Sequence, residues 1–237
     1  MSSRSSRSST WMTRVGVLLV VAGLVLAGYV AWQLYGTNAT SQRTHRSLVD
    51  EVERKWEQQN SYRAGQDGPR GGVPTDHGDV TAVVRIPAFG DDYAVPVLEG
   101  SSDEVLASGF GHLDGTAGAG ERGNYALAAH RVTHGEPLRD LPSLEPGDEV
   151  VVETARWTYT YVLDTPGDGL TVPFTGTWVL ADLPRNPDAG GVQPPGREPA
   201  QRLITLTTCS ELFHTDDRLV AFGHLVSKDE RNRDRPF

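Results

Sequence analysis

The chain has 237 residues, 38% of them hydrophobic and 22% charged, which suits one sizeable globular domain with appended segments. A formal net charge of -9 leaves no basic surface for nucleic acid, so we expect no nucleic-acid partner. The 26 glycines and 15 prolines argue against an all-helical body, and the single cysteine, Cys209, excludes an intramolecular disulfide.

The first predicted element is a membrane span at residues 15–35, which contain no charged side chain. In a helix rising ~1.5 Å per residue, this stretch covers roughly 30 Å, the thickness of a bilayer's hydrocarbon core. Three arginines and no acidic residue precede it, which favours a cytoplasmic tail at 1–14 and an extracytoplasmic remainder. We therefore predict a single-pass signal anchor in the cell membrane. The alternative is a cleaved signal peptide, whose apolar region usually has ~7–15 residues.

Residues 36–79 are predicted to form a stalk or linker. The stretch 44–59 favours a helix, because its apolar residues recur on one side. These are Leu48, Val49, Val52 and Trp56.

From residue 80 the pattern changes to short β runs separated by turn signals, which predicts an all-β domain over 80–228 and a flexible charged tail at 229–237. Eight strands, with short helices between them, suggest a closed or nearly closed barrel. The candidate strands are 81–88, 93–100, 124–130, 148–154, 157–164, 169–174, 202–209 and 218–226. The segment 181–201 is too rich in Pro and Gly for regular structure, and a loop of that length is often functional.

Cys209 stands at the end of the alternating apolar run 203–208, so a strand would deliver its thiol to an edge of the barrel. A nucleophilic thiolate needs a base or a cation beside it. His130 ends another apparent strand and is the candidate base. The alternative for Cys209 is a buried small hydrophobe, and the residues alone leave both open.

Arg218 begins the last predicted strand, directly after the loop that leaves Cys209. Two neighbouring antiparallel strands would bring it beside the thiol, where a guanidinium can stabilise an oxyanion. The alternative is a rim charge paired with Asp216 or Asp217.

His130 and His134 have the i, i+4 spacing of zinc ligands on a helix. The glutamate of the metalloprotease motif is missing, and Gly135 and Pro137 argue against a helix, so we expect no metal. His112 falls in a Gly-rich loop, and the other histidines are expected in loops or on the surface: His45, His77, His214 and His224.

Together, T-L-T-T-C at 205–209, Arg218, and His130 within G-N-Y-A-L-A-A-H resemble the sortase family of cysteine transpeptidases, over residues 80–227. The motifs G-x-G-H at 109–112, H-R-x-T-x-G at 130–135 and L-x-x-G-D at 144–148 are most similar to class E enzymes of Gram-positive actinobacteria. The class usually has Pro and Tyr around the G-H element, where this chain has Phe110 and Leu113, and Gly before the histidine, where it has Ala129.

The resemblance implies an eight-stranded sortase-type β-barrel in which Cys209 attacks the Thr carbonyl of an LPxTG- or LAxTG-like sorting signal and cleaves between Thr and Gly. His130 would act as acid and base, Arg218 would bind the oxyanion, and Thr208 and Leu113 would bind substrate. The implied partners are secreted proteins bearing the C-terminal signal and an amine of lipid II, with no metal or other cofactor. The alternatives are a non-catalytic domain that binds cell-wall proteins, and a pilin-polymerising enzyme.

Overall fold

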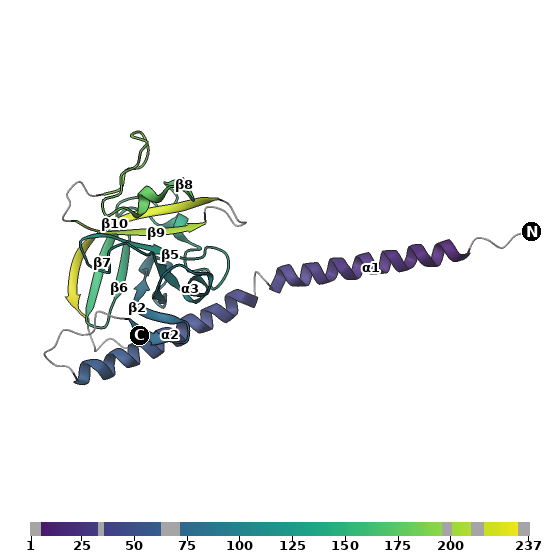
Figure 1. Cartoon of the computed structure of the whole chain (residues 1–237), viewed down its shortest axis with the longest axis horizontal. Coiled ribbons are helices and arrows are strands. Elements are labelled where there is room, and N and C mark those ends of the chain that lie inside the picture. The colour runs from purple at the N-terminus through teal and green to yellow at the C-terminus, as the bar shows by residue number, and fades with distance from the viewer. Residues whose placement is uncertain (1–5, 33–35, 63–71, 196–200, 210–215, 232–237) are drawn as a thin grey trace, which may run out of the picture.

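The computed structural model describes residues 6–32, 36–62, 72–195, 201–209 and 216–231. Figure 1 shows a β-barrel approached by two long helices. The first, α1 (Ser6–Ala31), projects away from the barrel, and the second, α2 (Thr37–Tyr62), lies along it.

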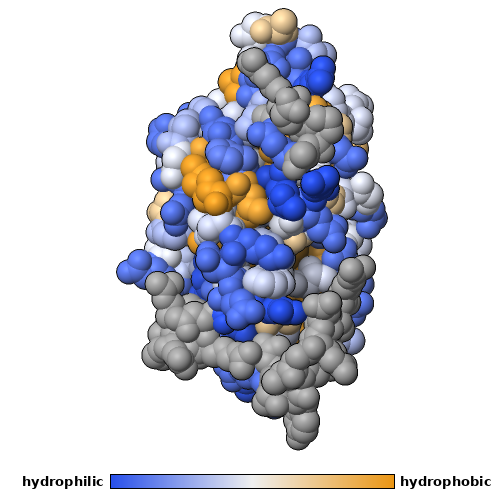
Figure 2. Space-filling view, turned by 90° about the vertical axis from the view of Figure 1, so that its left-hand side faces the viewer, coloured by the Kyte–Doolittle hydropathy of each residue, from blue (hydrophilic) through white to orange (hydrophobic). Residues whose placement is uncertain are grey.

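Helix α1 contains the one candidate membrane span found among the described residues, Trp11–Val30, with a mean hydropathy of 2.0 and none of its window buried. The span predicted at 15–35 therefore begins earlier, and Gln33, Leu34 and Tyr35 lie outside the described residues. The length and composition of α1 suit a bilayer crossing. Figure 2, which views the left-hand side of Figure 1, shows a mainly hydrophilic surface with one compact hydrophobic patch.

Helix α2 contains the helix predicted at 44–59 and extends it at both ends. The four apolar residues of its inner side are buried, and three of them form a cluster with strand residues: Val49, Val52 and Trp56 pack with Val73, Val80, Val83 and Leu98, while Leu48 is buried outside this cluster. Arg85 fixes the helix further, because its guanidinium pairs with Glu53 of α2 at 3.0 Å and with Glu153 at 3.1 Å. Part of the predicted stalk is thus packed onto the domain.

Eight strands close the barrel in the order β2-β3-β4-β5-β9-β10-β7-β6, and β6 pairs with β2 to complete the ring. The two remaining strands, β1 and β8, pair with β2 and β10 from outside the ring. The strands are β1 (Val73–Thr75), β2 (Gly78–Arg85), β3 (Val95–Glu99), β4 (Phe110–His112), β5 (Gly123–Ala128), β6 (Glu149–Glu153), β7 (Trp157–Leu163), β8 (Thr171–Pro173), β9 (Arg202–Cys209) and β10 (Asp217–Glu230). The short helices are α3 (Asp103–Ser108), η2 (Pro87–Phe89), η3 (Leu141–Ser143) and η4 (Thr177–Leu180).

The predicted eight-stranded barrel is confirmed, with one exchange in its membership. All eight predicted strands are present, but 169–174 forms β8 outside the ring, and β4 takes its place. β4 lies where the sequence predicted a Gly-rich loop. Gly111 explains its close packing, because a Cβ there would lie 2.4 Å from the carbonyl oxygen of Gly100.

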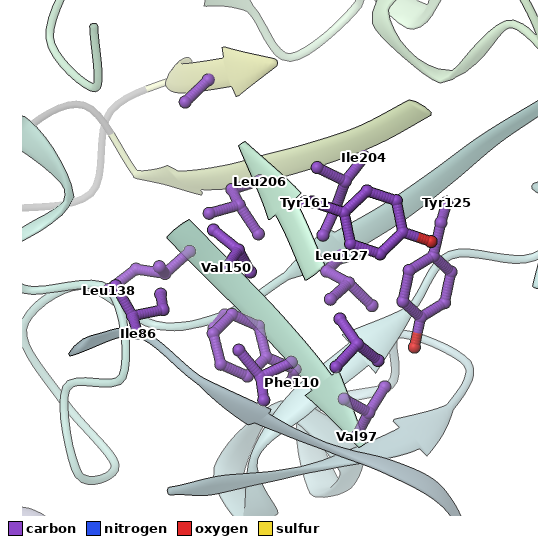
Figure 3. Packing of buried hydrophobic residues seen from close by; sticks show 14 of the residues in the cluster. Ile86, Val97, Phe110, Tyr125, Leu127, Leu138, Val150, Tyr161, Ile204 and Leu206 are labelled. Atoms are coloured by element: carbon purple, nitrogen blue, oxygen red, sulfur yellow. The ribbon is translucent and has the colours of Figure 1, made fainter. Parts of the chain in front are cut away.

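The barrel interior is filled by alternate residues of the strands. Figure 3 shows Phe110, Tyr161, Ile204 and Leu206 converging there, and all four are fully buried. Because Ile204 and Leu206 point inward, the odd-numbered residues of β9 face outward. Cys209, the last residue of β9, therefore lies on the outer face of the barrel.

Candidate active site

Cys209 and Arg218 are a cross-strand pair at the ends of β9 and β10. In the antiparallel register Cys209 lies opposite Arg218, just as Thr207 lies opposite Val220. Directly paired residues project their side chains from the same face of a sheet. Both side chains are partly exposed. The thiol and the guanidinium therefore share one solvent-accessible end of the outer face.

His130 reaches the same place from β5, which runs parallel to β9. The last registered pair is Ala128 with Thr207, and the Ala129 amide then donates to the Thr207 carbonyl at 3.2 Å. His130 and Cys209 each follow two residues after that pair. The backbone of His130 therefore comes level with that of Cys209, on a neighbouring strand about 4.8 Å away.

A buried polar network shows that β5 and β9 present the same face here. The Thr205 hydroxyl donates to Asn124 Oδ1 at 2.7 Å, and Asn124 Nδ2 donates to the Val179 carbonyl at 2.9 Å. With a period of two residues, His130 and Cys209 continue the face that Asn124 and Thr205 begin. Cys209, Arg218 and His130 thus lie at or just beyond the ends of three adjacent strands. Their thiol, guanidinium and imidazole are the groups needed for nucleophilic attack with oxyanion and acid–base assistance.

Phe174 holds Arg218 in a way that the sequence did not reveal. The Arg218 Cζ lies 5.2 Å from the centroid of the Phe174 ring, a cation–π distance, and Arg218 Nη1 donates to the Asp217 carbonyl at 3.0 Å. Phe174 is 69% exposed and directly follows β8, which pairs with β10 opposite Arg218. Only the β8–β10 register could have identified it.

His134 stacks on His130, with ring centroids 4.7 Å apart and planes inclined by 28°. The spacing that was weighed as a zinc motif therefore produces a stacked pair. Throughout the described residues, no three His, Cys, Asp or Glu side chains gather in a group suited to a metal ion.

The expectation that His45 lies in a loop or on the surface is wrong. It belongs to α2 and is only 4% exposed, because α2 packs against the loop that follows His130. Burial lowers the pKa of His45 to about 4, and the charge of His134 acts in the same direction. Of the remaining histidines, His77 is exposed in a turn and His224 lies in β10, while His214 falls outside the described residues.

The two residues predicted to bind substrate, Thr208 and Leu113, take different positions relative to Cys209. Thr208 is buried on the inward side of β9, and its hydroxyl donates to the Ala129 carbonyl at 2.8 Å, which joins the two strands just before the candidate residues. The Leu113 amide donates to the Ala126 carbonyl, and Ala126 pairs with Thr205. Because Thr205 is four residues from Cys209, Leu113 lies roughly 13 Å along the strand from the level of Cys209.

A cavity of about 470 Å³ opens at the opposite end of the barrel. It is bordered by residues 118–121, which precede β5, and by Lys228 near the end of β10, whereas Cys209 lies by the end of β5 and the start of β10. His112 lines this cavity and bonds Glu99 through Nδ1 at 2.9 Å. The structure therefore does not bring His112 to Cys209.

Comparisons with known proteins identify the family. The family described as Sortase domain matches residues 84–226. Sortase SrtE1 of Streptomyces coelicolor is 31% identical over 229 residues, covering 94% of this chain and 59% of that protein, and SrtE2 of the same organism is 30% identical, covering 93% and 84%. The chain thus spans about three fifths of the length of SrtE1.

Two solved structures share the barrel. Sortase E from Streptomyces avermitilis superposes with a TM-score of 0.56 at 36% identity, over 69% of this chain and 97% of that chain. Sortase E1 from Streptomyces coelicolor, solved with a tripeptide in its active site, gives a TM-score of 0.54 at 34% identity, over 69% and 98%.

Proposed function

The chain belongs to the sortase family, and from that premise we propose that it is a membrane-tethered cysteine transpeptidase of class E type whose nucleophile is Cys209. One observation supports the proposal: Cys209 pairs with Arg218 across β9 and β10, and His130 follows the end of β5, the parallel neighbour of β9. The catalytic domain would occupy residues 80–228.

The proposed reaction begins when the Cys209 thiolate attacks the Thr carbonyl of an LPxTG- or LAxTG-like sorting signal. Arg218 donates hydrogen bonds to the oxyanion, and His130 protonates the departing Gly amine as the Thr–Gly bond breaks. A thioester remains on Cys209. An amine acceptor, which we propose to be lipid II, attacks the thioester and gives a proton to His130. This step forms a new amide and releases Cys209 as the thiolate.

The proposed substrates also explain the membrane helix. A secreted protein held by its C-terminal sorting region and a lipid-linked acceptor would both diffuse in the bilayer, so tethering through Trp11–Val30 would raise their effective concentration at the enzyme. Orientation with residues 1–14 in the cytoplasm is part of the proposal. We propose further that Leu113 contacts a part of the signal remote from the scissile bond, and that Thr208 acts next to the thioester.

The test is cleavage of a peptide library by the whole chain in lipid nanodiscs, with an amine acceptor present and mass spectrometry as the readout. We expect cleavage between Thr and Gly, transfer to the acceptor, and loss of both in Cys209→Ala and His130→Ala. Transfer by Cys209→Ala would contradict the proposal. Binding of signal peptides without cleavage by the unmodified chain would favour a binding module instead, and transfer only to a lysine side chain would favour pilin polymerisation.

A further inference from the structure

Asn38, at the start of α2, is bonded on three sides to the loop that follows His130. Its Nδ2 donates to the Val132 carbonyl at 3.2 Å and to Glu136 Oε1 at 2.6 Å, and its Oδ1 accepts from the Gly135 amide at 3.1 Å. We propose that Asn38 is a positioning residue for His130, an inference that rests on the proposed acid–base role of His130.

The loop needs such support because three successive residues have left-handed backbone conformations. The φ angles are 54° at His134, 83° at Gly135 and 54° at Glu136. Side chains with a Cβ atom rarely adopt this region, because the Cβ approaches the following carbonyl oxygen. Two of the three bonds from Asn38 fall on this stretch, so they oppose its relaxation toward ordinary backbone angles.

The shape of the loop determines what lies against the His130 ring. The left-handed turn carries His134 back over His130, where the rings stack at 4.7 Å. The loop then closes on the same residue, because the Leu138 amide donates to the His130 carbonyl at 3.1 Å. A loop that relaxed at residues 134–136 would therefore move the stacking partner of His130 and alter its ring orientation.

The helix that contains Asn38, α2, also packs closely against the loop and holds it in place. A Cβ on Gly135 would lie 2.6 Å from the Cε1 atom of His45. Gly135 is thus needed both for its φ angle and for contact with the helix. Since Asn38 follows Val30 by eight residues, at most about 28 Å of extended chain separates the candidate membrane span from this support.

Asn38→Asp is the informative substitution, because it preserves the shape and the acceptor for Gly135. It removes both Nδ2 donors and sets a second carboxylate against Glu136. Adding Glu136→Gln should restore this hydrogen bond in the reverse direction, with the introduced glutamine amide donating to the introduced aspartate carboxylate. The double variant therefore tests whether activity is rescued. Thr40→Ala is the matched control, since the exposed Thr40 hydroxyl bonds Gly36 within the same helical turn.

With the whole chain in nanodiscs, we expect Asn38→Asp to lower kcat about tenfold or more with little change in KM, because the acid–base group is misplaced while the substrate still binds. The pH profile of kcat/KM should shift as well. The double variant should recover most of the loss, and Thr40→Ala should match the unmodified chain. An Asn38→Asp variant with unaltered kcat and pH profile would overturn the proposal. Asn38→Ala, which removes all three bonds without adding charge, provides the same test if Asn38→Asp does not fold.

A second readout does not depend on activity. In protein labelled with ¹³C at histidine Cε1, Asn38→Asp should shift the resonances of His130 and His134 and leave that of His224 in place. If the unmodified chain cleaves no peptide but these shifts occur, the proposed function fails while the positioning role stands. If it cleaves peptides and neither kcat nor the His130 resonance responds to Asn38→Asp, the positioning role alone fails.

Discussion

Arg218 stands directly opposite Cys209 across β9 and β10, and its guanidinium is held 5.2 Å from the ring centroid of Phe174. The strand register thus fixes where the Arg218 backbone lies relative to the thiol. The aromatic ring then limits where the charge can go. The two features can be tested separately by mutation: the guanidinium of Arg218 and the ring of Phe174 that supports it.

Arg218→Lys should lower kcat substantially although the positive charge remains. An ammonium cannot present the planar fork of donors that a guanidinium offers to an oxyanion and a peptide carbonyl at once. Loss of one oxyanion donor typically costs about 10²–10³ in kcat, so we expect Arg218→Ala to reach that range and Arg218→Lys to approach it. Steady-state kinetics on a signal peptide would measure both, and full activity in Arg218→Lys would contradict the assigned role.

Phe174→Ala should reduce activity more mildly, because the charge stays but loses its support. An exposed cation–π contact contributes about 0.5–1 kcal/mol, which corresponds to a decrease in kcat of up to about fivefold. The effect should vanish in an Arg218→Ala background, since Phe174 acts through Arg218. A decrease of the same size in both backgrounds would show that Phe174 acts independently of Arg218.

Thr208→Val should destabilise the fold and reduce activity together. The substitution keeps the shape but leaves the buried Ala129 carbonyl without the hydroxyl that now bonds it at 2.8 Å. An unsatisfied buried acceptor costs about 1–3 kcal/mol, which urea unfolding would detect. Thr171→Val, on the exposed side of β8, is the control and should change the free energy of unfolding by less than about 0.5 kcal/mol.

The sequence predicted the barrel strands well where side chains alternate over many residues. The run 203–208 indicated β9, and its inward and outward faces follow from that alternation. β4 was missed because three residues, one of them Gly111, carry no readable period. Its place in the ring depends on close backbone contact at Gly111, which cannot be predicted from composition.

The candidate site was predictable to the extent that its residues end long strands. Cys209 and Arg218 were placed together from chain order, and β9 and β10 do pair. Phe174 and Asn38 were not identified, because each contacts a partner distant in the sequence. His134 was considered only as a metal ligand, because its stacking on His130 depends on the left-handed backbone at residues 134–136. His45 was misplaced for a related reason: the packing of α2 on the loop after His130 is a tertiary contact.

His45 should make folding stability depend on pH in the acid range. Its pKa falls from 6.5 to about 4 on folding, so between these values the unfolded chain binds the proton and the folded chain does not. Stability from this group is therefore present above pH 6.5 and is lost as pH falls toward 4, by up to about 3 kcal/mol. His45→Leu should flatten the pH dependence of the unfolding free energy over that interval. Ser47→Ala, at an exposed position of α2, should leave that pH dependence unchanged.

Trp56→Ala should weaken the attachment of α2 to the barrel. The indole is buried, and the Arg231 guanidinium lies 4.9 Å from its ring centroid. Removing a buried Trp typically costs about 3–5 kcal/mol, and here the loss should concentrate in α2. Limited proteolysis should then cut within α2 faster than in the unmodified chain. The neighbouring exposed Glu57→Ala should not change the rate, and equal rates in both variants would contradict this packing role.

The parallel pairing of β5 with β9 also determines how late in folding the site can form. The bonded residues Ala129 and Thr208 are 79 positions apart, and Arg218 arrives later still on β10. Ordering so long an intervening chain delays such contacts in folding. A partly synthesised chain would hold His130 long before Cys209, so the proposed chemistry could begin only once almost the whole barrel had been made. Late assembly of this kind would keep a reactive cysteine from acting on the nascent chain itself.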